Sequence, residues 1–253
     1  MQELSGKTAI ITGASKGIGE AATRYMASLG VNVVLAARSE SSVKTITEEI
    51  IGDGGSAIGS ACDVSDYDQV KTVVDLAVKT FGGVDILVNN AGLIDPISRL
   101  EDSDPSEWDK VIDVNVKGVY YGAHATLPYM KKKGSGVIIN ISSGAATSAL
   151  EGWSHYCSSK AAALSLTRCI HREEAENGIR VVGLSPGTVA TDMQVAIKAS
   201  GINPVSQLDP SVHIPPEWVA KTIAWLATDD AQSFDGDDVS LRDEEIRKRV
   251  GLA

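Results

Sequence analysis

The chain alternates short, continuously apolar runs with longer segments of helical periodicity, and no other feature of the sequence constrains the fold as strongly. Six such runs predict strands, at residues 8–12, 31–37, 56–62, 84–89, 136–141 and 180–184, and a shorter strand is expected at 238–241. The helical patterns lie at residues 18–29, 40–51, 67–81, 106–131, 155–177 and 216–227. Apolar runs without polar alternation are typical of strands that helices cover on both faces. The sequence therefore predicts an α/β fold, with a doubly wound parallel sheet in one domain over residues 1–253.

Residues 188–216 interrupt this rhythm. They contain Gly201 and four prolines around a short helical stretch at 192–200. A long insertion after a strand end in an open α/β sheet is often a lid or a substrate loop. We predict a substrate lid, with an ordered surface connection as the alternative. Residues 242–253 are expected to form a charged C-terminal tail.

Composition excludes several classes of protein. The formal charge of −10 argues against a nucleic-acid or anionic-membrane surface as the main partner. No run approaches the roughly 20 apolar residues of a membrane span, and the N-terminus shows no secretion signal. Cys62, Cys157 and Cys169 lack metal-type spacing, which favours reduced thiols. We therefore expect a cytoplasmic protein that acts on a small molecule, with no metal, nucleic-acid or membrane partner.

A glycine-rich turn follows the first strand directly. Gly13, Gly17 and Gly19 lie between that strand and the first helix. Glycines at this place permit a tight turn and let backbone N–H groups approach a diphosphate, which the helix N-terminus also favours. The turn predicts a dinucleotide site, and a simple helix-capping turn is the alternative.

The end of the second strand indicates which dinucleotide is bound. An acid at this place hydrogen-bonds the ribose 2′-hydroxyl of NAD, whereas a basic residue accommodates the 2′-phosphate of NADP. Here the sequence has Arg38 and no carboxylate until Glu40, and Lys16 lies in the glycine turn. These residues predict NADP(H) rather than NAD(H), although Arg38 could instead simply face solvent.

Tyr156 and Lys160 are four residues apart within a helical pattern, so they lie on one face of the helix. An unperturbed tyrosine titrates near pH ~10 and needs help to exchange protons at neutral pH. Lys160 against the Tyr156 ring could provide that help. On this spacing alone, a surface pair without chemistry is the more frequent outcome.

Several motifs in order resemble the short-chain dehydrogenase/reductase family over nearly the whole chain. Thr12–Gly19 is similar to its Thr-Gly-x-x-x-Gly-x-Gly turn, and Asn89–Gly92 to its Asn-Asn-Ala-Gly signature. The resemblance implies a Rossmann fold, a homodimer or homotetramer, and catalysis by Asn115, Ser143, Tyr156 and Lys160. It implies cofactor contacts from Gly13, Ser15, Lys16, Gly17, Ile18, Gly19, Arg38, Asp63, Val64, Asn90, Ala91, Gly92, Tyr156, Lys160, Pro186, Gly187, Val189 and Thr191.

The family pattern also assigns roles to the catalytic residues. Its serine stands thirteen positions before the tyrosine, which selects Ser143, while Ser142 is expected to point to the opposite face and pack. Ser143 would donate a hydrogen bond to the carbonyl oxygen, and Tyr156 would deliver the proton. Lys160 would hold the nicotinamide ribose and, together with the charge of the oxidised nicotinamide ring, lower the pKa of Tyr156. Asn115 would kink its helix and hold a water.

The expected substrate walls are Leu93–Ile97, Ser143, Ala145, Leu150, Trp153, and the loop from Met193 to Val212, with core packing as the alternative for Trp153. His155 adjoins Tyr156 but points about 100° away on a helix, so we assign it no catalytic role.

These residues predict an NADP(H)-dependent enzyme of the carbonyl reductase or alcohol dehydrogenase type, working on a ketone or aldehyde and its alcohol. The alternatives are an NAD-dependent enzyme working mainly in oxidation and a non-catalytic dinucleotide sensor. One region departs from the family: its Val-Asp-Gly-Gly ending is absent, and Phe234–Asp243 stands in its place.

Overall fold

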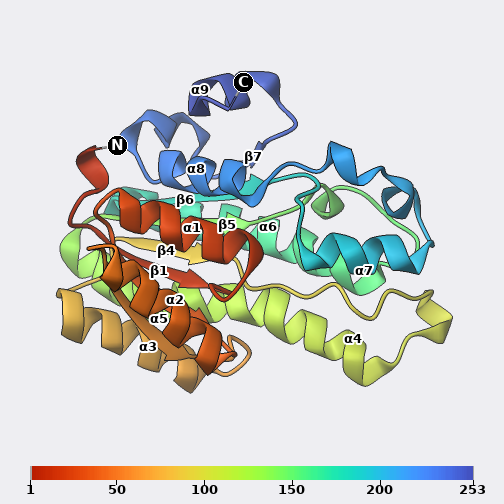
Figure 1. Ribbon diagram of the computed structural model, residues 1–253, viewed down its shortest axis with the longest axis horizontal. Helices are drawn as coiled ribbons and strands as arrows, with labels where there is room; N and C mark the ends of the chain where they lie inside the picture. The colour runs from red at the N-terminus through yellow and green to blue at the C-terminus, as the bar shows by residue number, and fades with distance from the viewer. Residues whose placement is uncertain (1, 253) are drawn as a thin grey trace.

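The computed structural model describes residues 2–252 and contains a seven-stranded, entirely parallel sheet in the order β3-β2-β1-β4-β5-β6-β7 (Figure 1). The strands are β1 (Thr8–Thr12), β2 (Asn32–Ala37), β3 (Ser56–Ala61), β4 (Ile86–Asn89), β5 (Gly136–Ile141), β6 (Ile179–Ser185) and β7 (Asp238–Ser240). The order reverses between β1 and β4, which is the place where such sheets bind ligands. The predicted parallel sheet and its Rossmann topology are confirmed.

Helices cover both faces of the sheet and bury two apolar clusters against it. One face carries α1 (Gly17–Ser28), α2 (Glu40–Gly52), α8 (Pro216–Leu226) and α9 (Glu244–Val250). The other face carries α3 (Tyr67–Phe81), α5 (Gly118–Lys133) and α6 (Ser154–Glu174). All residues of β1 and β5 are buried, as their continuous apolar runs predict. In contrast, β3 is the edge strand, and most of its residues are only half-buried because no other described strand pairs with its outer side.

The pattern predicted as one helix over 106–131 forms two helices joined by a wider turn. α4 (Pro105–Ile112) and α5 are separated by a π-helical turn at Asp113–Lys117. Asn115 lies within this turn and is buried. π-turns commonly bend a helix and occur at functional sites. The expected kink at Asn115 thus coincides with a π-helical turn.

The predicted lid segment is a loop whose two ends are held together. Val189 and Ile214 form a parallel β-bridge, and Ala190 N donates to Ile214 O at 2.9 Å. Between them lie α7 (Asp192–Ser200) and two short 3-10 turns at Pro204–Gln207 and Pro210–Val212. Figure 1 shows α7 and these turns beside the strand ends, away from both chain termini.

The C-terminal region extends the sheet and then returns over α8. β7 pairs with β6 through Gly183, Leu184 and Ser185. α9 follows and contributes Ile246 to the same apolar cluster as α8. Ala253, the last residue of the predicted tail, lies outside the described residues. Within residues 2–252, no helix has the length and apolarity needed to cross a bilayer.

Candidate active site

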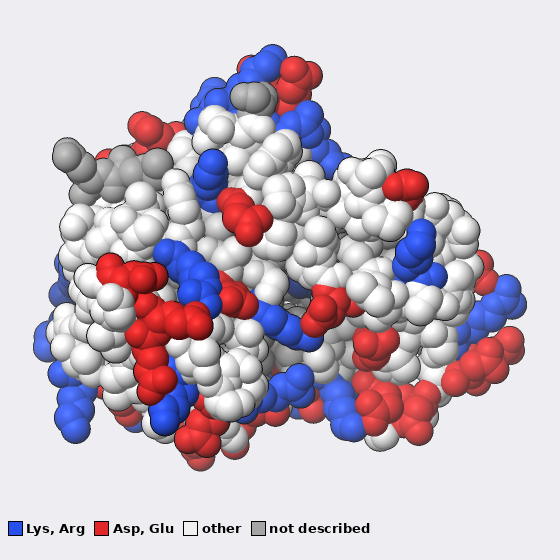
Figure 2. Space-filling view, viewed as in Figure 1, with Lys and Arg blue, Asp and Glu red and all other residues white. Residues whose placement is uncertain are grey.

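A cavity of about 1210 Å³ opens at the carboxyl ends of the strands, on the side of the sheet that faces α7. It is larger than the roughly 300–1,000 Å³ of most ligand pockets and has room for a dinucleotide together with a second small molecule. In Figure 2, basic and acidic side chains meet at an opening in this face of the protein. Of the predicted catalytic and cofactor-binding residues, all but Gly19 and Asn115 line this cavity. Leu93, Ile94 and Asp95 of the predicted substrate walls also line it, whereas Pro96 and Ile97 do not.

The glycine turn leaves no room for side chains. Gly13 has φ +64°, and a Cβ there would lie 2.9 Å from both Ala91 Cα and Asn90 Nδ2. A Cβ at Gly19 would lie 2.2 Å from Gly13 O, so Gly19 supports the turn from behind. Asn90 reinforces the same turn, because its Nδ2 donates to Thr12 O at 2.9 Å. The result is an open cradle of backbone at the N-terminus of α1, which fits a diphosphate.

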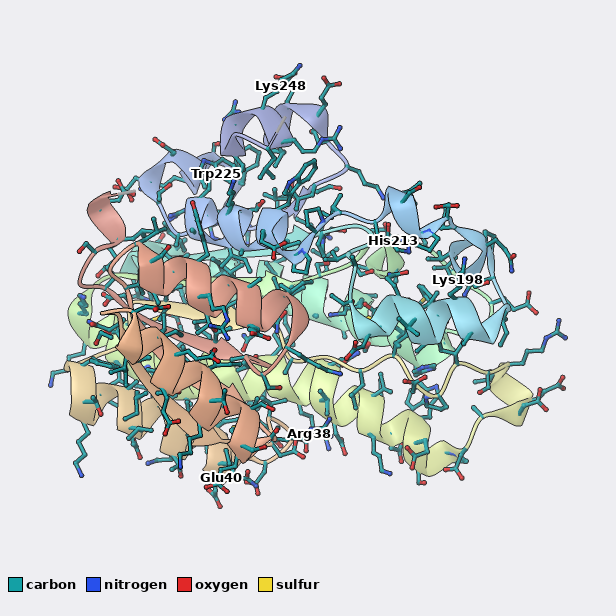
Figure 3. All side chains as sticks on the ribbon, viewed as in Figure 1. Arg38, Glu40, Lys198, His213, Trp225 and Lys248 are labelled. Carbon is teal, nitrogen blue, oxygen red and sulfur yellow. The ribbon has the colours of Figure 1, made fainter. Side chains whose placement is uncertain are left out.

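The adenosine end of the cradle differs from the sequence prediction in one respect. Lys16 does not extend toward Arg38; its Nζ forms an ion pair with Asp192 Oδ2 at 2.8 Å, across the cavity mouth. Arg38 is exposed at the end of β2 (Figure 3) and has no hydrogen bond or ion pair with any described residue. Asp192 follows Thr191 as the first residue of α7, so a residue of the segment 188–216 pairs with the lysine that we expected at the 2′-phosphate.

Tyr156, Lys160 and Ser143 meet at the inner end of the cavity. Tyr156 and Lys160 lie on one face of α6, with the Lys160 Nζ 5.6 Å from the centre of the Tyr156 ring. Lys160 donates to Ile141 O at 2.8 Å. Ser143, at the end of β5, is hydrogen-bonded to the Tyr156 hydroxyl. The helical pair is therefore buried inside the protein and is not a surface feature.

Burial dominates the acid–base properties of this cluster. Desolvation raises the pKa of Tyr156 to about 12, although the hydrogen bond with Ser143 lowers it. Desolvation also lowers the pKa of Lys160 to about 8, and the negative charge of Asp238 opposes this decrease. Loss of hydration thus dominates the pKa of Tyr156 here, and its lowering by Lys160 together with the charge of the oxidised nicotinamide stays a prediction.

Asn115 lies one layer behind these residues. Its Oδ1 accepts from Leu93 N at 2.8 Å, and its Nδ2 donates to Leu93 O at 2.9 Å and to Ser159 Oγ at 3.0 Å. A Cβ on Gly92 would lie 3.5 Å from Asn115 Oδ1 and 3.8 Å from Lys160 Nζ. Asn115 thus fixes the backbone after β4 and stands close to Lys160, with Gly92 between them.

Two neighbours of the catalytic residues have structural partners. Ser142 is buried and its Oγ donates to Asp238 Oδ2 at 3.1 Å, so it packs away from Ser143 as expected. His155 is fully buried, with its Nε2 2.6 Å from Ile94 O. This contact holds the loop after β4 and leaves the imidazole out of the cavity lining.

The end of the cavity where we predicted the substrate carries an apolar cluster. Tyr156, Trp153, Ala145, Ile94 and Ile197 form a separate buried cluster between α6 and α7. The Trp153 ring packs edge-on against the Tyr156 ring, with centroids 5.5 Å apart. Trp153 therefore packs in this cluster and also lines the cavity, as do Ala145, Leu150 and Met193.

Three further residues were not predicted from the sequence: Asp192, Asp238 and Arg242. Asp192 and Arg242 line the cavity, and Asp238 lies behind Ser142. In the sequence, Asp192 is marked only by its position next to Thr191. Asp238 and Arg242 are marked only by lying in Phe234–Asp243, which departs from the family pattern. The thiol of Cys62 also lines the cavity, but burial raises its pKa to about 11, which keeps it protonated and unreactive.

Comparisons with known proteins agree with this geometry. The sequence profile of the short chain dehydrogenase family matches residues 7–200. The chain is 36% identical to a 3-oxoacyl-[acyl-carrier-protein] reductase of Synechocystis over 240 residues, covering 92% of this chain and 94% of the relative. It is 30% identical to a cyclohexanol dehydrogenase of Acinetobacter over 237 residues, covering 92% of each. A crystal structure of a short-chain type dehydrogenase/reductase from Mycobacterium marinum superposes with a TM-score of 0.86 at 33% identity, covering 94% of both chains.

Proposed function

Because the chain belongs to the short-chain dehydrogenase/reductase family of oxidoreductases, we propose that it reduces a ketone or aldehyde to an alcohol with NADP(H), and that it also works in reverse. The observation that carries the proposal is the meeting of Ser143, Tyr156 and Lys160 in one cavity large enough for a dinucleotide and a substrate. The names of two relatives support chemistry between a carbonyl group and an alcohol, since one is named as a reductase of an oxo group and the other as a dehydrogenase of an alcohol.

The residues of the cavity fit a nicotinamide dinucleotide. The backbone of Gly13–Gly19 would hold the diphosphate, and Asp63 and Val64 the adenine. Asn90, Ala91 and Gly92 would line the middle of the cofactor. Pro186, Gly187, Val189 and Thr191 would hold the carboxamide. A bound nicotinamide supplies or accepts the hydride.

The chain's own side chains would manage charge and protons. Ser143 donates a hydrogen bond to the carbonyl oxygen, where negative charge develops during reduction. Tyr156 holds the proton on its hydroxyl and passes it to that oxygen. Lys160 stabilises the phenolate that remains and contacts the ribose, and Asn115 positions a water for reprotonation. These roles require the pKa of Tyr156 to fall below the value to which burial raises it. The charge of the oxidised cofactor would act together with Lys160 to lower that pKa.

The apolar walls favour a substrate whose carbonyl carries an apolar group. Ile94, Trp153 and Ile197 surround the reacting end without a described charge in their cluster. We propose cyclic, aryl or aliphatic ketones as the first compounds to test. The segment 188–216 would act as the lid over them, and Met193 would contact the substrate.

The test is consumption of NADPH by the purified protein with a panel of aliphatic ketones, aryl ketones, ketoesters and sugars. The expected result is turnover with at least one ketone and its loss, by about 10²–10⁴-fold, in Tyr156→Phe. Near-normal turnover in Tyr156→Phe would refute the mechanism. Cofactor binding without any turnover across the panel would favour a dinucleotide sensor.

The second candidate is an NAD-dependent alcohol dehydrogenase. It is favoured by the ion pair between Lys16 and Asp192, because Lys16 is then not available to a 2′-phosphate. Of the two cations that we expected at that phosphate, Arg38 alone is left for it. Parallel titrations of the protein with NADH and NADPH distinguish the two candidates, since a 2′-phosphate reader binds NADPH more tightly.

We further propose a cytoplasmic homodimer or homotetramer that contacts its copies through α4, α5 and α6. Tyr120 on α5 is a large side chain with 48% exposure on one of these helices. Light scattering coupled to size-exclusion chromatography measures the assembly, and a monomer of 26.5 kDa would exclude it.

A further inference from the structure

Asp238 places a carboxylate beneath α6, in a region where this chain departs from its family's pattern. In the sheet, Asp238 of β7 is paired with Gly183 of β6, which in turn is paired with Asn140 of β5. A Cβ on Gly183 would lie only 2.5 Å from Asp238 Oδ1. The carboxylate therefore occupies the space over β6 that a side chain at position 183 would fill. The Asn140 amide, in the same row, donates to Thr167 of α6. The Asp238 carboxylate therefore lies on the face of the sheet that α6 covers.

The carboxylate reaches the strand end that holds the catalytic lysine. Asp238 Oδ2 accepts from Ser142 Oγ at 3.1 Å, and Lys160 donates to the carbonyl of Ile141 at 2.8 Å. The ammonium and the carboxylate thus contact two consecutive residues at the end of β5. Asp238 Oδ1 is buried without a hydrogen-bond partner among the described residues. A carboxylate oxygen in this position is costly unless a nearby positive charge compensates for it.

The two charges influence each other in opposite directions. Burial raises the pKa of Asp238 to about 6, and Lys160 opposes that increase. Burial lowers the pKa of Lys160 to about 8, and Asp238 opposes that decrease. Near neutral pH, between these two values, both groups are charged. A buried ammonium that donates to a carbonyl gains little charge compensation from it, whereas a carboxylate supplies a full opposite charge.

Four other charged or titratable groups surround this pair. Asp237 is 74% exposed at its side chain and lies 3.8 Å from Arg168 of α6. Arg168 lowers the pKa of Asp238, while Asp237 raises it. His171 of α6 packs against Gly236, and Tyr156 covers the other side of Lys160. None of these residues supplies a buried negative charge to Lys160 at neutral pH.

We propose that Asp238 is a positioning residue that acts through Lys160: its carboxylate is the counter-charge that keeps the buried ammonium protonated, and so able to stabilise the Tyr156 phenolate, at and above neutral pH. The inference deepens the proposed function and rests on the role given there to Lys160. Ser142 completes the arrangement, because its hydroxyl orients the carboxylate beside the strand end.

The decisive experiment measures the ionisation of Lys160 directly and needs no substrate. Protein with isotope-labelled lysine is titrated by NMR, and the Lys160 signal is identified by its loss in K160R. In D238N the side chain keeps its shape and can still accept from Ser142, but it has no charge. The pKa of Lys160 should fall by about 0.5–1 unit in D238N. The matched control D237N removes the same charge one residue away, on an exposed side chain, and should change that pKa far less.

A reciprocal measurement keeps the inference testable if D238N does not fold. In the Lys160→Gln variant, the pKa of the Asp238 carboxyl should rise by the same amount, because coupling between two sites is mutual. An unchanged Lys160 pKa in D238N, or an unchanged Asp238 pKa in Lys160→Gln, overturns the inference. Neither result depends on turnover, so failure of the proposed reaction would be recognised separately.

Once a ketone substrate is known, the pH profile gives a further readout. Activity that needs the Lys160 ammonium is lost as the pH rises through the pKa of that group. The alkaline limb of the kcat profile should therefore move to lower pH in D238N, by about 0.5–1 pH unit. A uniform decrease at every pH would indicate a merely structural role and contradict the proposal.

Discussion

The two ends of the cavity are built on different physical principles. At the inner end, Tyr156 and Lys160 are 7% and 6% exposed, and each has defined partners in the sheet or on the neighbouring loop. At the outer end, the side chains of Lys16 and Asp192 are 73% and 77% exposed, and Arg38 has no described partner. Buried polar groups cannot exchange their partners for water without a large cost, whereas exposed charges can. The inner end is thus preorganised, and the outer end is adjustable.

This difference separates the chemistry from the choice of cofactor. Donors held rigidly in a dry site stabilise developing charge without rearranging during the reaction. Exposed ion pairs contribute only about 0–1 kcal/mol and are weakened by salt. Substitutions at the inner end should therefore have large effects on turnover, and those at the outer end smaller effects on cofactor preference.

Besides the loss of turnover expected for Tyr156→Phe, the largest effect is expected at Ser143. In Ser143→Ala, kcat for ketone reduction should fall by about 10²–10³-fold, because the donor to the developing oxyanion is lost. Cofactor affinity, measured by tryptophan fluorescence, should stay close to that of the wild type. Ser148→Ala is the matched control, since Ser148 lines the cavity after the same strand but is exposed. Equal losses in the two variants would show that the inner end is not the reacting centre.

A smaller effect is expected at Arg38, and it concerns the outer end. Arg38→Asp should lower the preference for NADPH over NADH by roughly tenfold to a hundredfold, because a charge-assisted hydrogen bond is worth about 1.5–3 kcal/mol. The ratio of the two dissociation constants gives the measurement. Lys44→Asp makes the same change of charge on α2, where Lys44 already pairs with Glu48. If the ratio responds equally to both variants, Arg38 does not read the phosphate.

The smallest effect is expected at Asp192. Asp192→Asn releases Lys16 and should raise the NADPH-to-NADH preference by about two- to fivefold, the scale of an exposed ion pair. The gain should shrink in higher salt and disappear when Lys16 is also replaced by Gln. A gain that persists without Lys16 would mean that Asp192 repels the 2′-phosphate directly.

Sequence reasoning succeeded where local spacing determines position. The strand bounds at Thr8–Thr12 and Gly136–Ile141 and the short helix at Asp192–Ser200 were predicted to the residue. The spacing of Tyr156 and Lys160 places them on one face of α6, and the thirteen-residue offset brings Ser143 to the same cavity. These features depend on helix and strand periods, which a sequence states directly.

It was less successful where partners come from distant segments. The pair between Lys16 and Asp192 joins residues 176 positions apart, and no local pattern encodes it. The contact of Ser142 with Asp238 joins residues 96 positions apart. It also requires Gly183 to have no side chain, because the Asp238 carboxylate occupies that space. The effect of burial on the pKa of Tyr156 could not be predicted from the sequence, because desolvation depends on the whole fold, whereas the spacing to Lys160 depends only on a helix.

The bridge between Val189 and Ile214 has a consequence for how such a protein can change. Because the bridge pins both ends of the segment beside β6, the residues between them form a closed unit with its own helix and turns. Such a unit can be exchanged for that of a relative without altering the strand that carries Ser143 or the helix that carries Tyr156. Under the proposed function, exchange of this segment alone would change the substrate preference and leave the proposed proton-transfer residues in place.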